Sequence, residues 1–149
     1  VYKRQSIRRM AEEHRRNVLA LDSVREESFK LALREGIRIS FGTDSYPNPF
    51  PERAYPGGSE GIPTYRLELE TYVKWGMKPA EVIRAMTSTA AEACGISEKT
   101  GSIEKGKLAD ILVVKGNPLD NISVLGDKQN IETVMQNGVV VVRRKAPTE

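Results

Sequence analysis

Only one segment before residue 100 has the alternating pattern of a β-strand, and it ends in a short polar sequence. In the segment IRISF, residues 37–41, apolar residues occupy every second position, as in a half-buried strand. The segment follows Gly36, which stands where a glycine commonly ends a helix, and it continues into GTDS, residues 42–45. A helix, a glycine and a strand with a polar end are typical of one repeat of an α/β fold.

A long loop is predicted directly after this strand. Residues 45–63 contain five prolines and three glycines, which exclude regular secondary structure there. A loop of this length in a compact domain is usually functional or mobile, and its place after Asp44 favours a function. Solvent exposure is the ordinary state of loop side chains, but five of them have the chemistry to contact a substrate: Tyr46, Asn48, Arg53, Tyr55 and Ser59.

The other elements follow from apolar periodicity and from turn residues. Helical spacing predicts helices at residues 6–21, 23–35, 65–75 and 79–95. Their predicted apolar faces carry Phe29, Leu31, Ala32 and Leu33, then Leu69, Tyr72 and Val73, then Val82, Ile83, Met86, Ala90 and Ala93. From Gly101 the pattern changes to β, with a strand at residues 108–114. Residues 132–136 and 139–143 flank Asn137-Gly138, the strongest short signal for a hairpin.

The charge pattern and the single cysteine limit the classes of function. The formal net charge is +3 and the basic residues are scattered, so we expect no nucleic-acid partner. No stretch approaches the ~20 apolar residues of a membrane-spanning helix, so we expect no membrane partner. Cys94 is the only cysteine, so no disulfide can form within the chain. A single cysteine fits a reducing compartment, and we expect a cytoplasmic protein.

The first five residues, Val1 to Gln5, fit a sequencing artefact. GTG-TAT-AAG-AGA-CAG encodes them, and this string matches the end of a transposon adaptor used to prepare sequencing libraries. GTG is also a bacterial start codon, so a gene finder could begin a reading frame there. Residues 1–5 would then have no part in the fold. The alternative is a basic N-terminal arm. A genomic copy with these residues in frame would refute the artefact.

Three segments together resemble the last third of enzymes of the amidohydrolase superfamily. They are IRISFGTDS at residues 37–45, GMKPAEVIRAMTSTAAEACGI at residues 76–96 and GSIEKGKLADILVVKGNPLDNISVL at residues 101–125. The third segment is the most specific, whereas GTD alone would be a weak signal. The resemblance covers roughly residues 24–143 and is strongest to the imidazolonepropionase-like and Xaa-Pro-dipeptidase-like branch.

The resemblance implies an α/β fold, namely the C-terminal portion of a (β/α)8 barrel plus the C-terminal half of a small β-sandwich. Residues 37–44 would be the last barrel strand, and residues 64–95 the helices that close the barrel. We expect the barrel part over residues 6–100, the sandwich part over residues 101–144 and a tail over residues 145–149. A complete barrel of this kind needs ~250 residues. We therefore expect this chain of 149 residues to be a fragment.

Asp44 is the candidate catalytic residue and the candidate metal ligand. It stands at the end of the predicted strand, where barrel enzymes carry their active sites. The resemblance makes it the aspartate of the eighth strand, which binds a divalent metal and moves a proton from the attacking water to the leaving nitrogen. A carboxylate suits both tasks, because it is a hard oxygen ligand and a base. An Asx-turn is the purely structural alternative for Asp44. The flanking Thr43 and Ser45 are candidates to hydrogen-bond its carboxylate.

The other metal ligands that the resemblance implies are missing. Such enzymes take an HxH pair from the first strand, a carboxylated lysine or a glutamate from the fourth, and histidines from the fifth and sixth. The one histidine here, His14, lies in a charged helical pattern and is interpreted as a surface residue. Zinc is the metal that the resemblance favours. Because three or four protein ligands are usual for zinc, Asp44 alone should bind it weakly.

Other residues with reactive or polar side chains are assigned structural roles. Cys94 is predicted to be a small buried residue before a glycine that ends a helix. Trp75 ends a helix and is predicted to pack. Glu104, Lys107 and Asp110 are predicted to mark the entry to a sandwich strand.

The resemblance implies a hydrolase that cleaves a C–N bond in an amide, a peptide or a cyclic amide, with a small-molecule or dipeptide-like substrate. Two alternatives stay open: a deaminase of the same superfamily, and a non-catalytic protein that keeps the fold without the metal. The full-length enzyme could be a homo-oligomer. Alone, the 149 residues should be inactive and poorly soluble. The reason for poor solubility is that residues 111–114 and 139–142 would expose apolar sheet edges.

Overall fold

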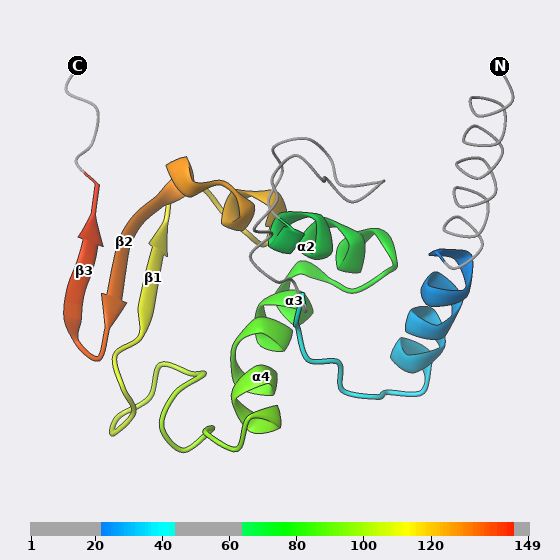
Figure 1. Ribbon diagram of the computed structural model, residues 1–149, viewed down its shortest axis with the longest axis horizontal. Helices are drawn as coiled ribbons and strands as arrows, with labels where there is room; N and C mark the ends of the chain where they lie inside the picture. Colours follow the sequence, from blue (N-terminus) through cyan, green and yellow to red (C-terminus); the bar gives the residue numbers. More distant parts are fainter. Residues whose placement is uncertain (1–21, 44–63, 145–149) are drawn as a thin grey trace, which may run out of the picture.

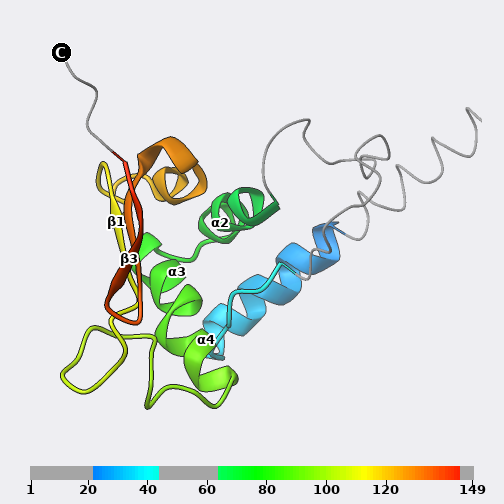
Figure 2. The same ribbon diagram turned by 60° about the vertical axis from the view of Figure 1, so that its left-hand side comes forward.

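The computed structural model describes residues 22–43 and 64–144, which form three layers (Figures 1 and 2). A sheet lies on one side, three helices lie in the middle, and the helix at residues 22–34 lies on the far side. The middle helices are α2 (Thr64–Lys74), α3 (Pro79–Met86) and α4 (Ser88–Ala93). The sheet contains β1 (Ile111–Val114), β2 (Ile131–Gln136) and β3 (Val139–Arg143), with the 3-10 helices η1 (Ile122–Gly126) and η2 (Lys128–Asn130) between β1 and β2. Over these two ranges, no helix has both the length and the apolar character needed to span a membrane.

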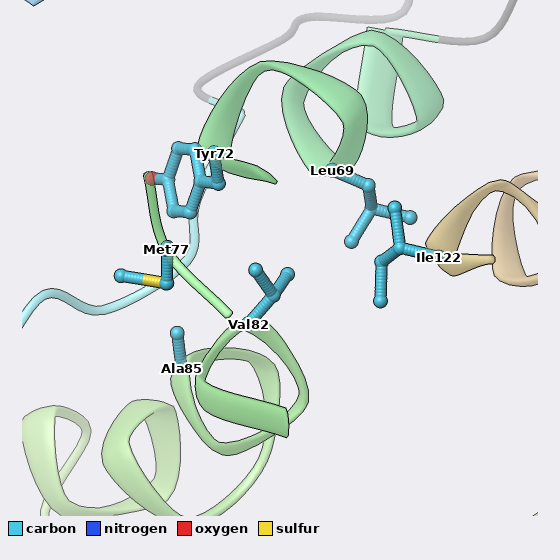
Figure 3. Close-up of a cluster of buried hydrophobic side chains, with 6 residues drawn as sticks. All are labelled: Leu69, Tyr72, Met77, Val82, Ala85 and Ile122. Carbon is cyan, nitrogen blue, oxygen red and sulfur yellow. The ribbon is translucent and has the colours of Figure 1, made fainter. Parts of the chain in front are cut away.

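One hydrophobic core joins the helices to the connection between β1 and β2 (Figure 3). Leu69 on α2 and Val82 on α3 are fully buried at its centre. Ile122 reaches the same core from η1. The remaining buried members are Tyr72, Met77 and Ala85. The helix at residues 22–34 packs on the outside of this core through Phe29, whose ring centroid lies 4.8 Å from that of Tyr72.

Helical periodicity predicted most of this core. The predicted residues Leu69, Tyr72 and Val82 are buried. Five further predicted residues are partly buried against them: Phe29, Leu33, Val73, Ile83 and Met86. Leu31 and Ala93 are exposed, so the apolar faces are narrower than predicted.

The single helix predicted at residues 79–95 is two helices. The break lies at Thr87, whose backbone angles, φ −118° and ψ −93°, are not helical. The Thr87 hydroxyl donates a hydrogen bond of 2.7 Å to the carbonyl of Ile83, four residues earlier. A threonine that bonds back in this way often bends a helix. The apolar spacing continues across Thr87, so periodicity alone did not reveal the break.

The strand predicted at residues 37–41 is not formed, because residues 37–43 have no regular secondary structure. The alternation of the pattern is present over part of the segment, since Ile39 and Phe41 pack against the core while Arg38 and Ser40 are exposed. Ile37, on the same predicted face, is exposed. A strand needs a neighbouring strand to complete its hydrogen bonds. Among the described residues the only sheet has the order β1-β2-β3, and this segment is not part of it. The predicted strand was wrong, and the predicted apolar face is partly buried at Ile39 and Phe41 but not at Ile37.

The predicted hairpin is confirmed. β2 and β3 are antiparallel, and the residues between them, Asn137 and Gly138, have φ angles of 49° and 79°. Positive φ at both positions is the mark of a type I′ turn. The strand predicted at residues 108–114 begins only at Ile111, because the N–H of Leu108 bonds instead to the carbonyl of Lys99 at 2.8 Å.

The sheet exposes apolar side chains, as predicted. The exposed residues are Leu112 and Val113 on β1 and Val139, Val140, Val141 and Val142 on β3. β1 and β3 are also the two edge strands of the sheet. Exposed apolar edges favour association with other chains, which is the physical basis of the predicted poor solubility.

Replacing Gly101 by alanine is expected to lower the free energy of unfolding by about 2 kcal/mol. The φ angle of Gly101 is +93°, and a Cβ there would lie 2.6 Å from the Cβ of Ala91 and 3.0 Å from the carbonyl oxygen of Thr87. Urea denaturation measures the change. Gly106→Ala is the matched control, because Gly106 has φ +95° with open space around it. Equal losses in the two variants would show that the contact with α4 contributes nothing.

Candidate functional site

The segment at residues 37–43, which leads directly to Asp44, is attached to all three middle helices. The Phe41 N–H donates a hydrogen bond of 3.0 Å to the carbonyl of Ala85 on α3. The Phe41 ring meets the Tyr72 ring of α2 edge-on, with 5.6 Å between centroids. The Arg38 guanidinium forms an ion pair with Glu92 on α4. The backbone that precedes Asp44 is therefore fixed on the helical layer.

Glu68 on α2 is partly buried beside the core. Its carboxylate accepts a hydrogen bond of 2.9 Å from the Tyr72 hydroxyl, one helical turn away. Partial burial raises the pKa of the Glu68 carboxyl above its ordinary value, and the bond from Tyr72 acts in the opposite direction. Burial, followed by the bond to Glu68, raises the pKa of the Tyr72 phenol, so Tyr72 keeps its proton and acts as the donor.

Reasoning from the sequence missed Glu68. A glutamate in a helix is usually solvated. Glu68 was therefore not predicted to have a role, although it stands four residues before the predicted core residue Tyr72. That spacing was the available signal, because residues four apart lie on the same face of a helix. A carboxylate on the apolar face of a helix needs a donor, and here the Tyr72 hydroxyl supplies it.

Most of the residues predicted for the site lie outside the described ranges. These are Asp44, Ser45, His14 and the loop residues Tyr46, Asn48, Arg53, Tyr55 and Ser59. Thr43, the last residue of the segment, is described and is partly buried. The structure therefore places the residues that precede Asp44, and the role of Asp44 stays a prediction.

Within residues 22–43 and 64–144, no group of three or more His, Cys, Asp or Glu side chains could hold a metal ion. Glu68 already accepts the Tyr72 hydroxyl, which suits a structural acceptor better than a ligand. The carboxylate of Asp44 has the right donor chemistry for a divalent cation, but a centre of three or four ligands would need further side chains. The described part of the chain thus supplies no metal centre of its own.

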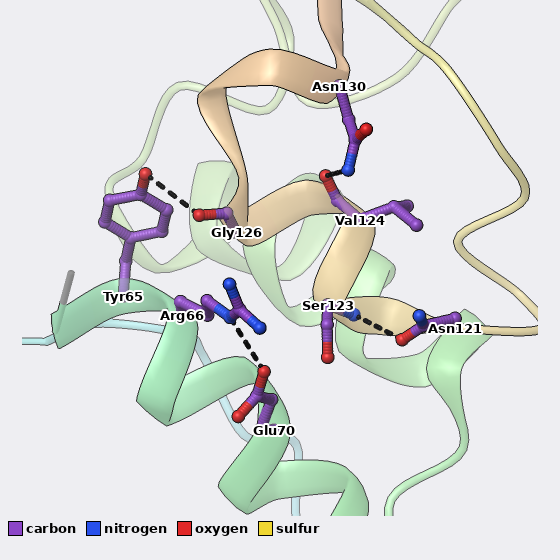
Figure 4. Close-up of polar contacts among 8 residues, drawn as sticks. All are labelled: Tyr65, Arg66, Glu70, Asn121, Ser123, Val124, Gly126 and Asn130. Atoms are coloured by element: carbon purple, nitrogen blue, oxygen red, sulfur yellow. Dashed lines mark hydrogen bonds and ion pairs between the residues drawn. The ribbon is translucent and has the colours of Figure 1, made fainter. Parts of the chain in front are cut away.

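A polar junction joins α2 to η1 beside the core (Figure 4). Arg66 and Glu70 on α2 form an ion pair of 2.9 Å, and bonds from Arg66 and then Ser123 lower the pKa of Glu70. The Tyr65 hydroxyl donates to the carbonyl of Gly126 at 3.4 Å. At Gly126 a Cβ would lie 2.6 Å from the Cβ of Arg66, so only glycine allows this close approach. The junction holds the sheet connection against the helices and offers no reactive group.

Four of the five residues to which the sequence assigned structural roles make contacts that agree with the assignment. Trp75 packs on Phe29, with 5.4 Å between ring centroids. Asp110 accepts the Asn137 N–H at 2.8 Å and so ties the entry of β1 to the hairpin turn. Lys107 donates to Ser102 at 2.6 Å and pairs with Glu104 at 3.5 Å. The prediction for Cys94 was wrong, because Cys94 is exposed. It caps the end of α4, whose buried residue is Ala91.

Comparisons with known proteins match most of the chain. The amidohydrolase family model matches residues 7–141. Ochratoxinase of Aspergillus niger is 31% identical over 114 residues, which are 75% of this chain and 21% of that protein. Imidazolonepropionase of Brevibacillus brevis is 30% identical over 107 residues, which are 72% of this chain and 23% of that protein.

A solved structure, a Xaa-Pro dipeptidase with methionine bound in its active site, is similar to this chain in fold. It has a TM-score of 0.60 and 34% identity, covering 77% of this chain and 25% of that one. The resemblance to the imidazolonepropionase-like and dipeptidase-like branch is thereby confirmed. The chain spans 21% and 23% of the length of the two curated relatives.

Proposed function

The chain belongs to the amidohydrolase family, and from this premise we propose that it is part of a metal-dependent hydrolase that cleaves a carbon–nitrogen bond. The observation that carries the proposal is the attachment of residues 37–43 to the helical layer. Asp44 is the next residue along the chain after this fixed segment, and the sequence predicts a long loop after it. Catalytic side chains in barrel enzymes stand at such places, where a rigid element ends and a loop begins.

In the proposed mechanism, the carboxylate of Asp44 is a metal ligand and a proton shuttle. Asp44 would help to hold a divalent metal, which we propose to be zinc and which would supply a water molecule of lowered pKa. The Asp44 carboxylate would take the proton of the attacking water and pass it to the nitrogen that leaves. The remaining ligands would come from other parts of the full-length protein.

The proposed substrate is a dipeptide or a cyclic amide. Two relatives support this class by name, an imidazolonepropionase and a Xaa-Pro dipeptidase. The alternatives are a deaminase of the same superfamily and a protein that keeps the fold without catalysis. We propose that the 149 residues alone are inactive, since Asp44 would lack its partner ligands.

Removal of metal from the full-length protein is expected to lower hydrolysis of its best amide substrate by at least about 100-fold. The assay would screen Xaa-Pro dipeptides and cyclic amides, then repeat the best one after chelation and after addition of zinc. Restored activity and a zinc content near one or two per chain would support the proposal. Release of ammonia from heterocycles without amide hydrolysis would favour the deaminase. A full-length protein without bound metal and without either activity would indicate the non-catalytic alternative.

A further inference from the structure

We propose that Asn137 is a site of spontaneous deamidation, and that the folded hairpin slows the reaction by binding the backbone N–H of Gly138. Asn137 is the only asparagine of the chain that is followed by glycine. It is exposed at the turn between β2 and β3, where water reaches its side-chain amide (Figure 1). The inference does not depend on the proposed function, which makes no use of this turn.

The reaction needs only the two turn residues and water. The backbone nitrogen of Gly138 loses its proton and attacks Cγ of Asn137, so that an N–Cγ bond closes a five-membered imide ring. The Cγ–Nδ2 bond breaks, and the Nδ2 group leaves as ammonia with that proton. Water then adds to one of the two ring carbonyl carbons and opens the ring, which gives aspartate or isoaspartate. Glycine hinders the attack least, because it has no Cβ.

Two hydrogen bonds restrain the turn in the folded protein. The Gly138 N–H, whose nitrogen would attack, donates to the carbonyl of Ala109 at 3.0 Å. Loss of its proton would break this bond and leave a nitrogen lone pair facing a carbonyl oxygen, which is unfavourable. The Asn137 N–H donates to Oδ1 of Asp110 at 2.8 Å. Both acceptors lie directly before β1, so the reaction requires the turn to separate from the entry to β1.

The other asparagines of residues 22–43 and 64–144 are matched controls. Asn121 and Asn130 are each followed by isoleucine, whose branched side chain hinders the approach of the backbone nitrogen. Asn117 is followed by proline, which has no backbone N–H to lose. These three sites therefore report how fast asparagine converts in this protein without a following glycine.

Conversion would change the hairpin as well as its charge. Isoaspartate adds a carbon atom to the main chain and places a carboxylate at the turn. The present turn has positive φ at both residues and fits a connection of two residues. Gln136 pairs with Val139 directly beside it, so a longer main chain would disturb the pairing of β2 with β3. Opening of the turn would thus be followed by a permanent change in the sheet.

The test incubates the full-length protein at mildly alkaline pH, folded in buffer and unfolded in guanidinium chloride. Mass spectrometry of its peptides follows the conversion of each asparagine with time. In the unfolded protein we expect Asn137 to convert several times faster than Asn121 and Asn130. In the folded protein we expect Asn137 to convert about tenfold more slowly than in the unfolded protein. Equal rates in the two states would overturn the restraint by the hairpin. A rate in the unfolded protein no greater at Asn137 than at Asn121 would overturn the site itself.

Two variants test the contribution of Asp110 to this restraint. Asp110→Ala removes the acceptor of the Asn137 N–H, and we expect Asn137 in the folded variant to convert about threefold faster than in the parent. Thr100→Val is the control, because the Thr100 hydroxyl donates to the other carboxylate oxygen of Asp110 at 3.1 Å. Its rate should stay within about twofold of the parent. Thermal melting establishes that both variants are folded at the incubation temperature. Equal acceleration in both variants would indicate general loosening and would overturn the role of the bond from Asn137.

Discussion

Replacing Asp44 by asparagine in the full-length protein is expected to lower kcat/KM for amide hydrolysis by about 1,000-fold. Asparagine has nearly the same size and can still hydrogen-bond, but it carries no negative charge and cannot accept a proton from the attacking water. Steady-state kinetics at neutral pH, together with metal analysis, would measure the effect. Because one ligand of several is altered, the metal content is expected to fall less than the activity does.

Asp110→Asn is the control for this substitution. Asp110 is also an aspartate within a segment that carries the family resemblance. Its carboxylate accepts hydrogen bonds from the Asn137 N–H at the hairpin turn and from the Thr100 hydroxyl. We expect this variant to keep kcat within about twofold, as is usual for changes away from a site. A kcat/KM for Asp44→Asn within tenfold of the parent would remove Asp44 from the mechanism and favour its interpretation as a turn residue.

Replacing Leu69 by alanine is expected to lower the free energy of unfolding by about 3 kcal/mol. Leu69 has no exposed surface, and it lies at the centre of the core between α2, α3 and η1 (Figure 3). The substitution removes the transfer free energy of the side chain and leaves a cavity that the neighbours fill only in part. Urea denaturation of the full-length protein, followed by tryptophan fluorescence of Trp75, would measure the change.

Leu119→Ala serves as its control, since Leu119 is 54% exposed. We expect that variant to stay within about 0.5 kcal/mol of the parent. A loss below about 1 kcal/mol for Leu69→Ala would mean that neighbouring side chains fill the cavity left by the substitution. It would contradict the tight packing described for the core around α2.

The parts of the fold that were predictable from sequence depend on local chemistry. The turn at Asn137 and Gly138 was predicted because two residues that tolerate positive φ are enough to specify it. The buried face of α2 was predicted because helical spacing alone determines which side chains share a face. These interactions need no knowledge of distant residues.

The parts that were not predictable depend on partners remote in sequence. Residues 37–41 have the alternation of a strand, but pairing depends on a neighbour that the described residues do not provide. The break at Thr87 depends on which bond its hydroxyl makes. Glu68 was missed because its partial burial depends on how the elements pack around α2. The site around Asp44 was predicted by resemblance and by position alone.

The place of Ile122 has a consequence for how the molecule unfolds. The change of pattern at Gly101 divides the chain into a helical part and a β part, yet Ile122 from the β part completes the core of the helical part. Cutting the chain at that division would leave Leu69 and Val82 facing water and would leave the sheet without its anchor. The two parts therefore lose their structure together, as one cooperative unit, although their sequences suggest two.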